Sequence, residues 1–175
     1  SYSRKRKVIT AASYTSWKRE RHFFDDEART MFEKLESLLS GYEIAITASD
    51  KAEENYIIRT YSDRSMGAYY LYDKTKEKLT KIQDVSPWLD EDQMAEVKPI
   101  QYRSRDGLVI HGYLTLPKGV EAKNLPVVVN PHGGPWARDN WGFNPEVQFL
   151  ANRGFAVLQM NFRGSTGYGK AFWEA

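Results

Sequence analysis

One loop in the sequence combines residue types that can stabilise negative charge. The stretch VVVNPHGGPWARD, Val127 to Asp139, passes from a run of β-branched residues into two adjacent glycines, Gly133 and Gly134. If the run is a strand of an open α/β sheet, its carboxyl end faces the crevice in which ligands bind. Glycines there bring backbone N–H groups close to a ligand, because no Cβ blocks the approach. Such donors stabilise a tetrahedral intermediate, so the loop predicts an oxyanion hole for acyl transfer.

The segments around this loop predict a strand, a helix and a second strand. The valines at 127–129 form a continuous apolar run, which is typical of a strand buried on both faces under covering helices. The Asn-Pro pair at 144–145 is a good helix start, and Gly154 ends that helix. The apolar stretch FAVLQMNFR predicts a second strand, parallel to the first. GSTGYG and the first turn of another helix, Lys170 to Ala175, follow. We expect the pattern to continue beyond the last residue.

The first 82 residues predict a β-rich region with one helix. An extended segment around Val8 to Tyr14 is followed by an aspartate pair at 25–26 that can cap a helix, which Gly41 then ends. The apolar stripe of this helix is Ala28, Met31, Phe32, Leu35, Leu38 and Leu39. From Tyr42 the period changes to two, and YEIAITASD, NYIIRTYSD, AYYLYD and KLTKI predict four short strands. A meander of this size corresponds to about one β-propeller blade, whose faces need neighbouring blades.

Two elements connect these regions. Between Gln83 and Pro99, Ser86 followed by Pro87 and the acidic run DEDQMAE predict a short helical linker. The stretch KPIQYRSRDGLVIHGYLTLP then predicts an antiparallel hairpin, because the Asp-Gly pair at 106–107 can form a tight turn.

Composition and charge exclude several classes of protein. A length of 175 residues suits one ordinary domain or two small pieces. Lys plus Arg number 25 and Asp plus Glu 23, so the net charge of +2 gives no basic field, and we expect no nucleic-acid partner. The absence of cysteine excludes disulfides and thiolate sites but leaves cytoplasmic and exported locations both open. No apolar stretch approaches the roughly 18 residues that span a bilayer, so we expect a soluble chain without a membrane partner.

The loop and its surroundings resemble a known family. NPHGGPWARD, followed by the helix and NFRGSTGYGKAFWEA, is similar to the start of the catalytic domain in the prolyl oligopeptidase family of serine peptidases, in its acylaminoacyl-peptidase or dipeptidyl-aminopeptidase-like branch. YYLYDKTKEKLTKI, SPWLDEDQM and YRSRDGLVIHGYLTLP resemble the last propeller blades and the hairpin by which such enzymes enter the α/β-hydrolase fold. The resemblance covers nearly the whole chain and is weakest over Ser1 to Ser40.

The resemblance implies a mixed α/β fold in which all-β propeller blades with an inserted helix precede the first, truncated part of an α/β-hydrolase sheet. We expect the C-terminal part of the propeller over residues 1–83 and a helical linker over 84–99. The N-terminal, incomplete part of the peptidase domain is expected over 100–175.

The resemblance also implies roles for the loop residues. A backbone N–H at Gly134, with Gly133 shaping the turn, shares the oxyanion with the residue after the nucleophile. In the family a Gly-x-Ser-x-Gly elbow, an Asp and a His follow in that order, and none of those segments is present in this sequence. In GSTGYG, Ser165 follows Gly164 directly, so Ser165 is not the nucleophile. His132 matches a residue that braces the turn, which disfavours a general-base role.

Several residues near the loop allow more than one interpretation. Trp136 and Arg138, with Asp139 and Trp141, either border a substrate pocket or only pack, and the sequence leaves both readings open. Arg163 is interpreted as a structural donor that holds the GSTGYG loop.

The remaining candidate residues are interpreted as structural rather than functional. His22 and His111 are expected to pack, and three isolated histidines without regular spacing make no metal site, so neither a metal nor a cofactor is expected. The basic run from Arg4 to Lys7, with further Lys and Arg residues around Trp17, is interpreted as a solvated strand edge rather than a nucleic-acid stripe.

Two classes of function follow. In the first, the chain is part of a serine peptidase that acts on short peptides, and is inactive alone because nucleophile, Asp and His are missing. In the second, it is a non-catalytic interaction module built from propeller strands; self-association through open sheet edges would instead indicate a fragment. An esterase or lipase of the α/β-hydrolase fold is a narrower alternative, against which Pro135, in place of a third glycine, and the upstream blade both argue.

Overall fold

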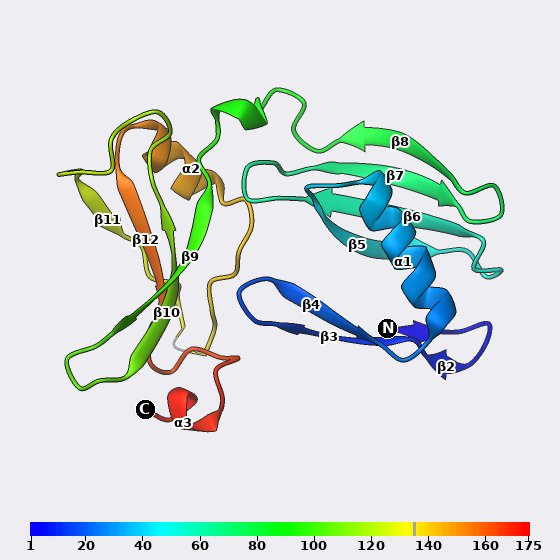
Figure 1. Cartoon of the computed structure of the whole chain (residues 1–175), viewed down its shortest axis with the longest axis horizontal. Helices are drawn as coiled ribbons and strands as arrows, with labels where there is room; N and C mark the ends of the chain where they lie inside the picture. The colour runs from blue at the N-terminus through cyan, green and yellow to red at the C-terminus, as the bar shows by residue number, and fades with distance from the viewer. Residues whose placement is uncertain (135) are drawn as a thin grey trace. The chain divides into compact units, whose positions relative to one another are not determined.

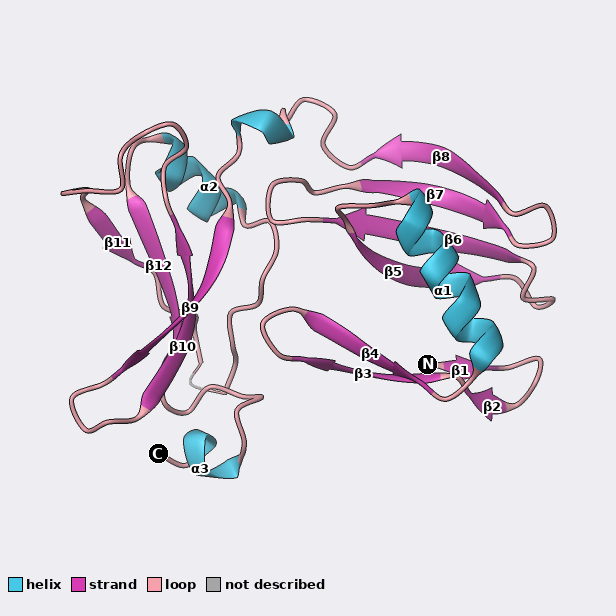
Figure 2. Ribbon diagram, in the orientation of Figure 1, coloured by secondary structure: helices cyan, strands magenta, loops and turns pink. Residues whose placement is uncertain are grey.

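The chain divides into two units, each with its own sheet and buried core (Figures 1 and 2). The computed structural model describes residues 1–134 and 136–175. The first unit comprises Ser1–Thr15 and Arg19–Asp90, and the second comprises Ser16–Lys18 and Glu91–Ala175.

An antiparallel meander forms the main sheet of the first unit. Its strands, paired in chain order, are β5 (Glu43–Ser49), β6 (Asn55–Tyr61), β7 (Ala68–Asp73) and β8 (Lys78–Asp84). In β6 the buried residues alternate with more accessible ones, as expected of a strand with one face on a core. The four strands predicted from the period of two are confirmed.

Helix α1 (Asp26–Leu38) packs on this meander. Asp25 is the N-cap, and its side chain accepts a hydrogen bond from the amide of Ala28 at 2.8 Å. Gly41 has a φ of +89°, which glycine adopts without strain, so the predicted start and stop of the helix are confirmed. The core is made by Phe32, Leu35, Leu39, Ile44, Tyr56, Ile58 and Tyr72. The prediction was wrong for Leu38, which is 46% exposed because it lies at the margin of the apolar stripe.

Two short antiparallel pairs precede α1. They are β1 (Tyr2–Ser3) with β2 (Val8–Ile9), and β3 (Ala11–Thr15) with β4 (Arg19–Phe23). The extended segment predicted around Val8 to Tyr14 is therefore present, but it is split at Thr10. Sequence patterns did not predict β4, because the charged residues of RERHF hide its alternation.

The sheet of the second unit is mixed. Its strands are β9 (Val97–Arg103), β10 (Val109–Thr115), β11 (Val127–Val129) and β12 (Ala156–Asn161). Their order is β11-β12-β10-β9, with β11 parallel to β12 and the other pairs antiparallel. Gly107 has a φ of +88° in the turn of the predicted β9–β10 hairpin. Both the hairpin and the parallel pair are confirmed.

Strand β11 differs from the prediction of burial on both faces. Val127 is 58% exposed and Val129 is 50% exposed. Val127 and Val129 lie on the same face of β11, and the described residues leave that face of this edge strand uncovered.

Three helical segments complete the second unit. The predicted linker helix is reduced to one 3-10 turn, η1 (Glu91–Gln93), because the polar segment around it offers no apolar stripe to bury. Helix α2 (Pro145–Asn152) begins as predicted, with Asn144 accepting hydrogen bonds from the amides of its first turn. Helix α3 (Lys170–Trp173) is the short helix predicted near the end of the sequence.

Candidate oxyanion site

The Gly133–Gly134 bend lies in the loop that leaves β11. The amide of Asn130 still donates to Leu158 of β12 at 2.8 Å, and beyond it the chain leaves the sheet. Both glycines are exposed. Gly134 has a φ of +151°, and a Cβ there would lie 2.9 Å from the amide nitrogen of Trp136, so the position favours glycine. A Cβ on Gly133 would meet nothing within 4 Å.

The amides of this bend are available to a ligand. Within residues 1–134 and 136–175, neither Gly133 nor Gly134 donates a backbone hydrogen bond. An exposed, unpaired N–H can therefore donate to an anionic oxygen without breaking a bond inside the protein. Pro135, which argued against an esterase, lies outside the described residues.

His132 anchors the loop immediately before the bend. Its Nε2 lies 2.8 Å from Oγ of Ser165, and its Nδ1 lies 2.8 Å from the carbonyl oxygen of Gly133. The imidazole also stacks on Phe162, with ring centroids 4.4 Å apart. Ser165 is fully buried, which leaves a substrate carbonyl no access to its hydroxyl, and its exclusion as the nucleophile stays a prediction.

Asp139 anchors the loop after the bend. Its amide donates to Oδ1 of Asn161 at 2.7 Å, and Nδ2 of Asn161 donates to the carbonyl of Asp139 at 3.1 Å. Its carboxylate accepts a hydrogen bond from Gln159 at 3.1 Å. Burial raises the pKa of Asp139, although the nearby His132 and the bond from Gln159 act in the opposite direction. Asn161 and Gln159 come from β12, so the sheet itself holds this end of the loop.

Arg138 is directed into the protein rather than into open space. Its guanidinium donates to the hydroxyl of Tyr168 at 2.9 Å and to the carbonyl of Ser16 at 3.1 Å, and it lies over the Tyr168 ring. A Cβ on Gly167 would lie 2.6 Å from this guanidinium, so glycine at 167 makes room for it. Burial raises the pKa of Tyr168, which keeps its hydroxyl available as a neutral partner. The pocket-border role of Arg138 stays a prediction.

Trp136 presents an aromatic surface beside the bend. It is 71% exposed and meets Trp173 of α3 edge to face, with ring centroids 6.1 Å apart. Trp173 was not singled out in the sequence, because its distance from the loop along the chain hides the contact. Trp141 instead packs inward, with its Nε1 donating to the carbonyl of Val97 at 3.0 Å.

The other candidate residues occupy structural positions. His111 stacks on Tyr168, with centroids 4.8 Å apart, and burial lowers the pKa of its imidazole. His22 contacts the ring of Phe24. Arg163 donates to Asp106 at 2.6 Å, in the β9–β10 turn, so its partner is the hairpin and not the GSTGYG backbone that the sequence suggested.

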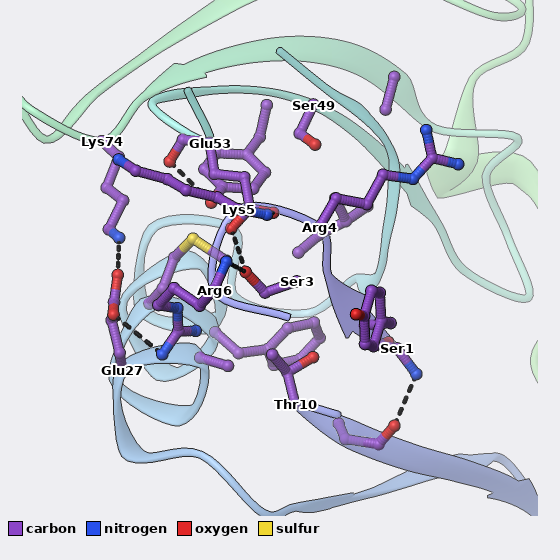
Figure 3. Close-up of a pocket in the computed structure, with 18 of the residues that line it drawn as sticks. Ser1, Ser3, Arg4, Lys5, Arg6, Thr10, Glu27, Ser49, Glu53 and Lys74 are labelled. Atoms are coloured by element: carbon purple, nitrogen blue, oxygen red, sulfur yellow. Dashed lines mark hydrogen bonds and ion pairs between the residues drawn. The ribbon is translucent and has the colours of Figure 1, made fainter. Parts of the chain in front are cut away.

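The first unit contains a separate cavity of about 700 Å³ (Figure 3). Ser3, Arg6, Glu27, Glu53 and Lys74 line it, and their charges are largely satisfied within the wall. Arg6 forms an ion pair with Glu27 at 3.1 Å, Lys74 pairs with the same carboxylate, and Ser3 donates to Glu53 at 2.6 Å. The wall of the cavity therefore holds internal ion pairs and one serine–carboxylate hydrogen bond. The sequence did not predict it, because its walls come from segments far apart in the chain.

In the described part of the chain, no group of three or more His, Asp or Glu side chains is placed to hold a metal ion. Among the same residues, no helix has the length and apolar character needed to cross a bilayer.

Comparisons with known proteins find peptidases. Residues 141–175 match the prolyl oligopeptidase family. The chain is 36% identical over 174 residues to dipeptidyl aminopeptidase BIII of Pseudoxanthomonas mexicana. The matched region covers 95% of this chain and 25% of the relative. The chain thus spans about a quarter of that relative's length.

Solved structures agree with the sequence relatives. An acylaminoacyl peptidase from Pyrococcus horikoshii superposes with a TM-score of 0.55 and 27% identity, covering 75% of this chain and 22% of that protein. An acylaminoacyl peptidase in complex with Z-Gly-Gly-Phe-chloromethyl ketone gives a TM-score of 0.53 and 26% identity, over 73% of this chain and 20% of that one.

Proposed function

Because the chain belongs to the prolyl oligopeptidase family, we propose that it is part of a serine peptidase acting on short peptides, and that it supplies half of the oxyanion hole. The observation that carries the proposal is the exposed Gly133–Gly134 bend after a sheet strand, whose amides donate no backbone hydrogen bond to the described residues, with an anchor on either side.

The chemistry assigned to the bend is electrostatic. When a serine attacks a peptide carbonyl, the carbonyl oxygen gains negative charge, and a fixed N–H at Gly134 stabilises it. One such donor is worth about 3 kcal/mol in acyl-transfer enzymes. This sequence contains no Gly-x-Ser-x-Gly motif, so we assign the second donor, the nucleophile, the acid and the base to residues outside it. We therefore propose that the 175-residue chain alone does not hydrolyse peptides.

The two units support an assignment to two different parts of a peptidase. We assign the meander and α1, within residues 1–83, to a propeller and residues 100–175 to the start of the hydrolase sheet, joined by residues 84–99. The relative named dipeptidyl aminopeptidase and the peptidase bound to a short peptide ketone favour short peptides over the lipid esters of an esterase.

A serine-directed fluorophosphonate tests the proposal. We expect no labelling of the 175-residue chain, and labelling of one serine in a longer chain that contains these residues and reaches the length of the relatives, called the complete enzyme below. Mass spectrometry of the labelled peptide identifies that serine. Labelling of Ser165, or a complete enzyme that is neither labelled nor active on short peptides, contradicts the proposal.

A further inference from the structure

The GSTGYG turn after β12 contains a buried serine that the proposed chemistry does not use. Ser165 is 0% exposed, and its own amide donates to the carbonyl of Phe162 at 3.0 Å. The amide of Gly164 donates to the carbonyl of Phe172 at 2.9 Å. The backbone around Ser165 is therefore fixed, and its hydroxyl is a fixed point for whatever it contacts.

That hydroxyl contacts His132, and the contact selects one form of the imidazole. The Gly133 carbonyl oxygen, 2.8 Å from Nδ1, can only accept a hydrogen bond, so Nδ1 carries the proton. In the neutral ring Nε2 is then an acceptor, and Ser165 donates to it across 2.8 Å. Stacking on Phe162, at an interplanar angle of 17°, fixes the ring plane.

The hydrogen bond from His132 to the Gly133 carbonyl also determines the direction of the neighbouring Gly134 N–H. The Gly133 carbonyl and the Gly134 N–H belong to one peptide group, and the described residues contain no cis peptide bond. In a trans peptide the C=O and N–H point in opposite directions within one plane. Holding the Gly133 oxygen toward the imidazole therefore directs the Gly134 N–H away from it.

We propose that Ser165 is a positioning residue for the oxyanion donor: its hydroxyl holds the Nδ1–H form of His132, and His132 in turn orients the Gly134 N–H. The inference rests on the proposed function for its catalytic meaning. The alternative, in which Ser165 and His132 form a nucleophile and base, is disfavoured because Ser165 is fully buried and the Gly133 carbonyl occupies the other ring nitrogen.

Kinetics of the complete enzyme test the catalytic consequence. We expect Ser165→Ala to lower kcat about tenfold with KM within about twofold, because a misdirected donor weakens binding of the transition state and not of the substrate. Ser165→Cys, which keeps a weaker donor of similar size, is expected to retain more of kcat and covers the case in which the alanine variant does not fold. Ser62→Ala is the matched control, since Ser62 is also buried and accepts backbone hydrogen bonds, but in the first unit.

A double variant tests whether Ser165 acts through His132. His132→Ala is expected to lower kcat at least as much as Ser165→Ala, and the combination of both is expected to lose little more than His132→Ala alone. Multiplicative losses would show that the two residues act independently and would overturn the inference.

The tautomer supplies a readout that needs no activity. The chain has 3 histidines, so selective [15N]histidine labelling with His132→Asn as the assignment control isolates one ring. At about pH 8, above the ordinary titration range of histidine, two-dimensional long-range 1H–15N spectra of the 175-residue chain are expected to show His132 protonated on Nδ1 only. Ser165→Ala is expected to shift the ring toward a mixture of tautomers.

The outcomes separate the inference from the proposed function. If the complete enzyme hydrolyses no peptide but the tautomer behaves as expected, the function fails and the Ser165–His132 coupling stands. If the enzyme is active while Ser165→Ala and Ser165→Cys leave kcat unchanged, or if His132 is protonated on Nε2, the positioning role is wrong and the function stands.

Discussion

The side chain of Gln148 forms a closed pair of hydrogen bonds with the backbone of Ala95. The amide of Ala95 donates to Oε1 at 2.9 Å, and Nε2 donates to the carbonyl of Ala95 at 2.8 Å. Both residues are buried, at 4% exposure each. Because a buried backbone group without a partner is costly, this contact fixes the segment before β9 to helix α2.

Removal of this contact is expected to destabilise the second unit. Gln148→Ala leaves the N–H and C=O of Ala95 without their partner and should lower the free energy of unfolding by about 3 kcal/mol. Tryptophan fluorescence in urea measures it, because the second unit holds Trp17, Trp136, Trp141 and Trp173. Gln101→Ala, at an exposed position, should stay within about 0.5 kcal/mol of wild type; equal effects of the two changes would contradict the prediction.

Gly112 lies where β10 passes β12 too closely for any side chain. A Cβ there would be 2.4 Å from the backbone carbonyl oxygen of Gln159. Gly112→Ala must therefore separate two paired strands, and we expect a loss of about 3 kcal/mol in the same urea titration. Gly133→Ala is the matched control, since a methyl there meets nothing within 4 Å, and its stability should not change measurably.

The N-cap of α1 makes stability depend on pH. The hydrogen bond from Arg6, followed by that from the Ala28 amide, lowers the pKa of Asp25 to about 2. A carboxyl with a depressed pKa in the folded state stabilises above its unfolded value, near 4, and loses that contribution as the pH falls toward 2. We expect the melting temperature of the first unit, followed by circular dichroism, to fall more steeply between pH 4 and pH 2 in wild type than in Asp25→Asn. Asp26→Asn, on the same turn, should keep the wild-type slope.

An ester in place of the Gly133–Gly134 peptide bond deletes the proposed donor without adding an atom to the bend. In the complete enzyme, made by semisynthesis, we expect kcat to fall about 100-fold with little change in KM, because the N–H acts in the transition state. The same replacement before Gly119, in an exposed turn, serves as the control. An unchanged kcat at the first position would remove Gly134 from the oxyanion hole.

The exposed edge of β11 predicts self-association of the 175-residue chain. Val127 and Val129 offer apolar side chains beside an edge that no strand of the described residues pairs with, and such edges recruit other chains. We expect Val129→Lys to shift the chain toward monomer in sedimentation experiments, whereas Val120→Lys, at an exposed valine outside the strands, should not.

The sequence predicted elements best where local chemistry decides the structure. The caps at Asp25 and Asn144 and the period of two from Tyr42 onward each depend on neighbouring residues, and these elements are present. The predicted burial of β11 on both faces was wrong because it depends on what packs over each face of the strand, and three valines carry no information about that.

Sequence patterns predicted the glycine bend of the candidate site but not the residues that hold it in place. Two glycines after a strand identify the bend, because the backbone at Gly134, with a φ of +151°, favours glycine. The partners of His132, Arg138 and Asp139 come from β12 and the loop after it, and no local pattern pairs residues so far apart. The polar residues Gln159 and Asn161 in the mainly apolar β12 were the available signal, since buried amides require hydrogen-bond partners.

The parallel register between β11 and β12 joins residues that lie far apart in the sequence. The first pair to form, such as Val128 with Val157, must close a long loop, whereas the meander joins strands that follow one another directly. Loop closure costs entropy that must be recovered later, so non-local strand pairs form slowly. On the ribosome, the meander can therefore assemble while β12 is still being synthesised.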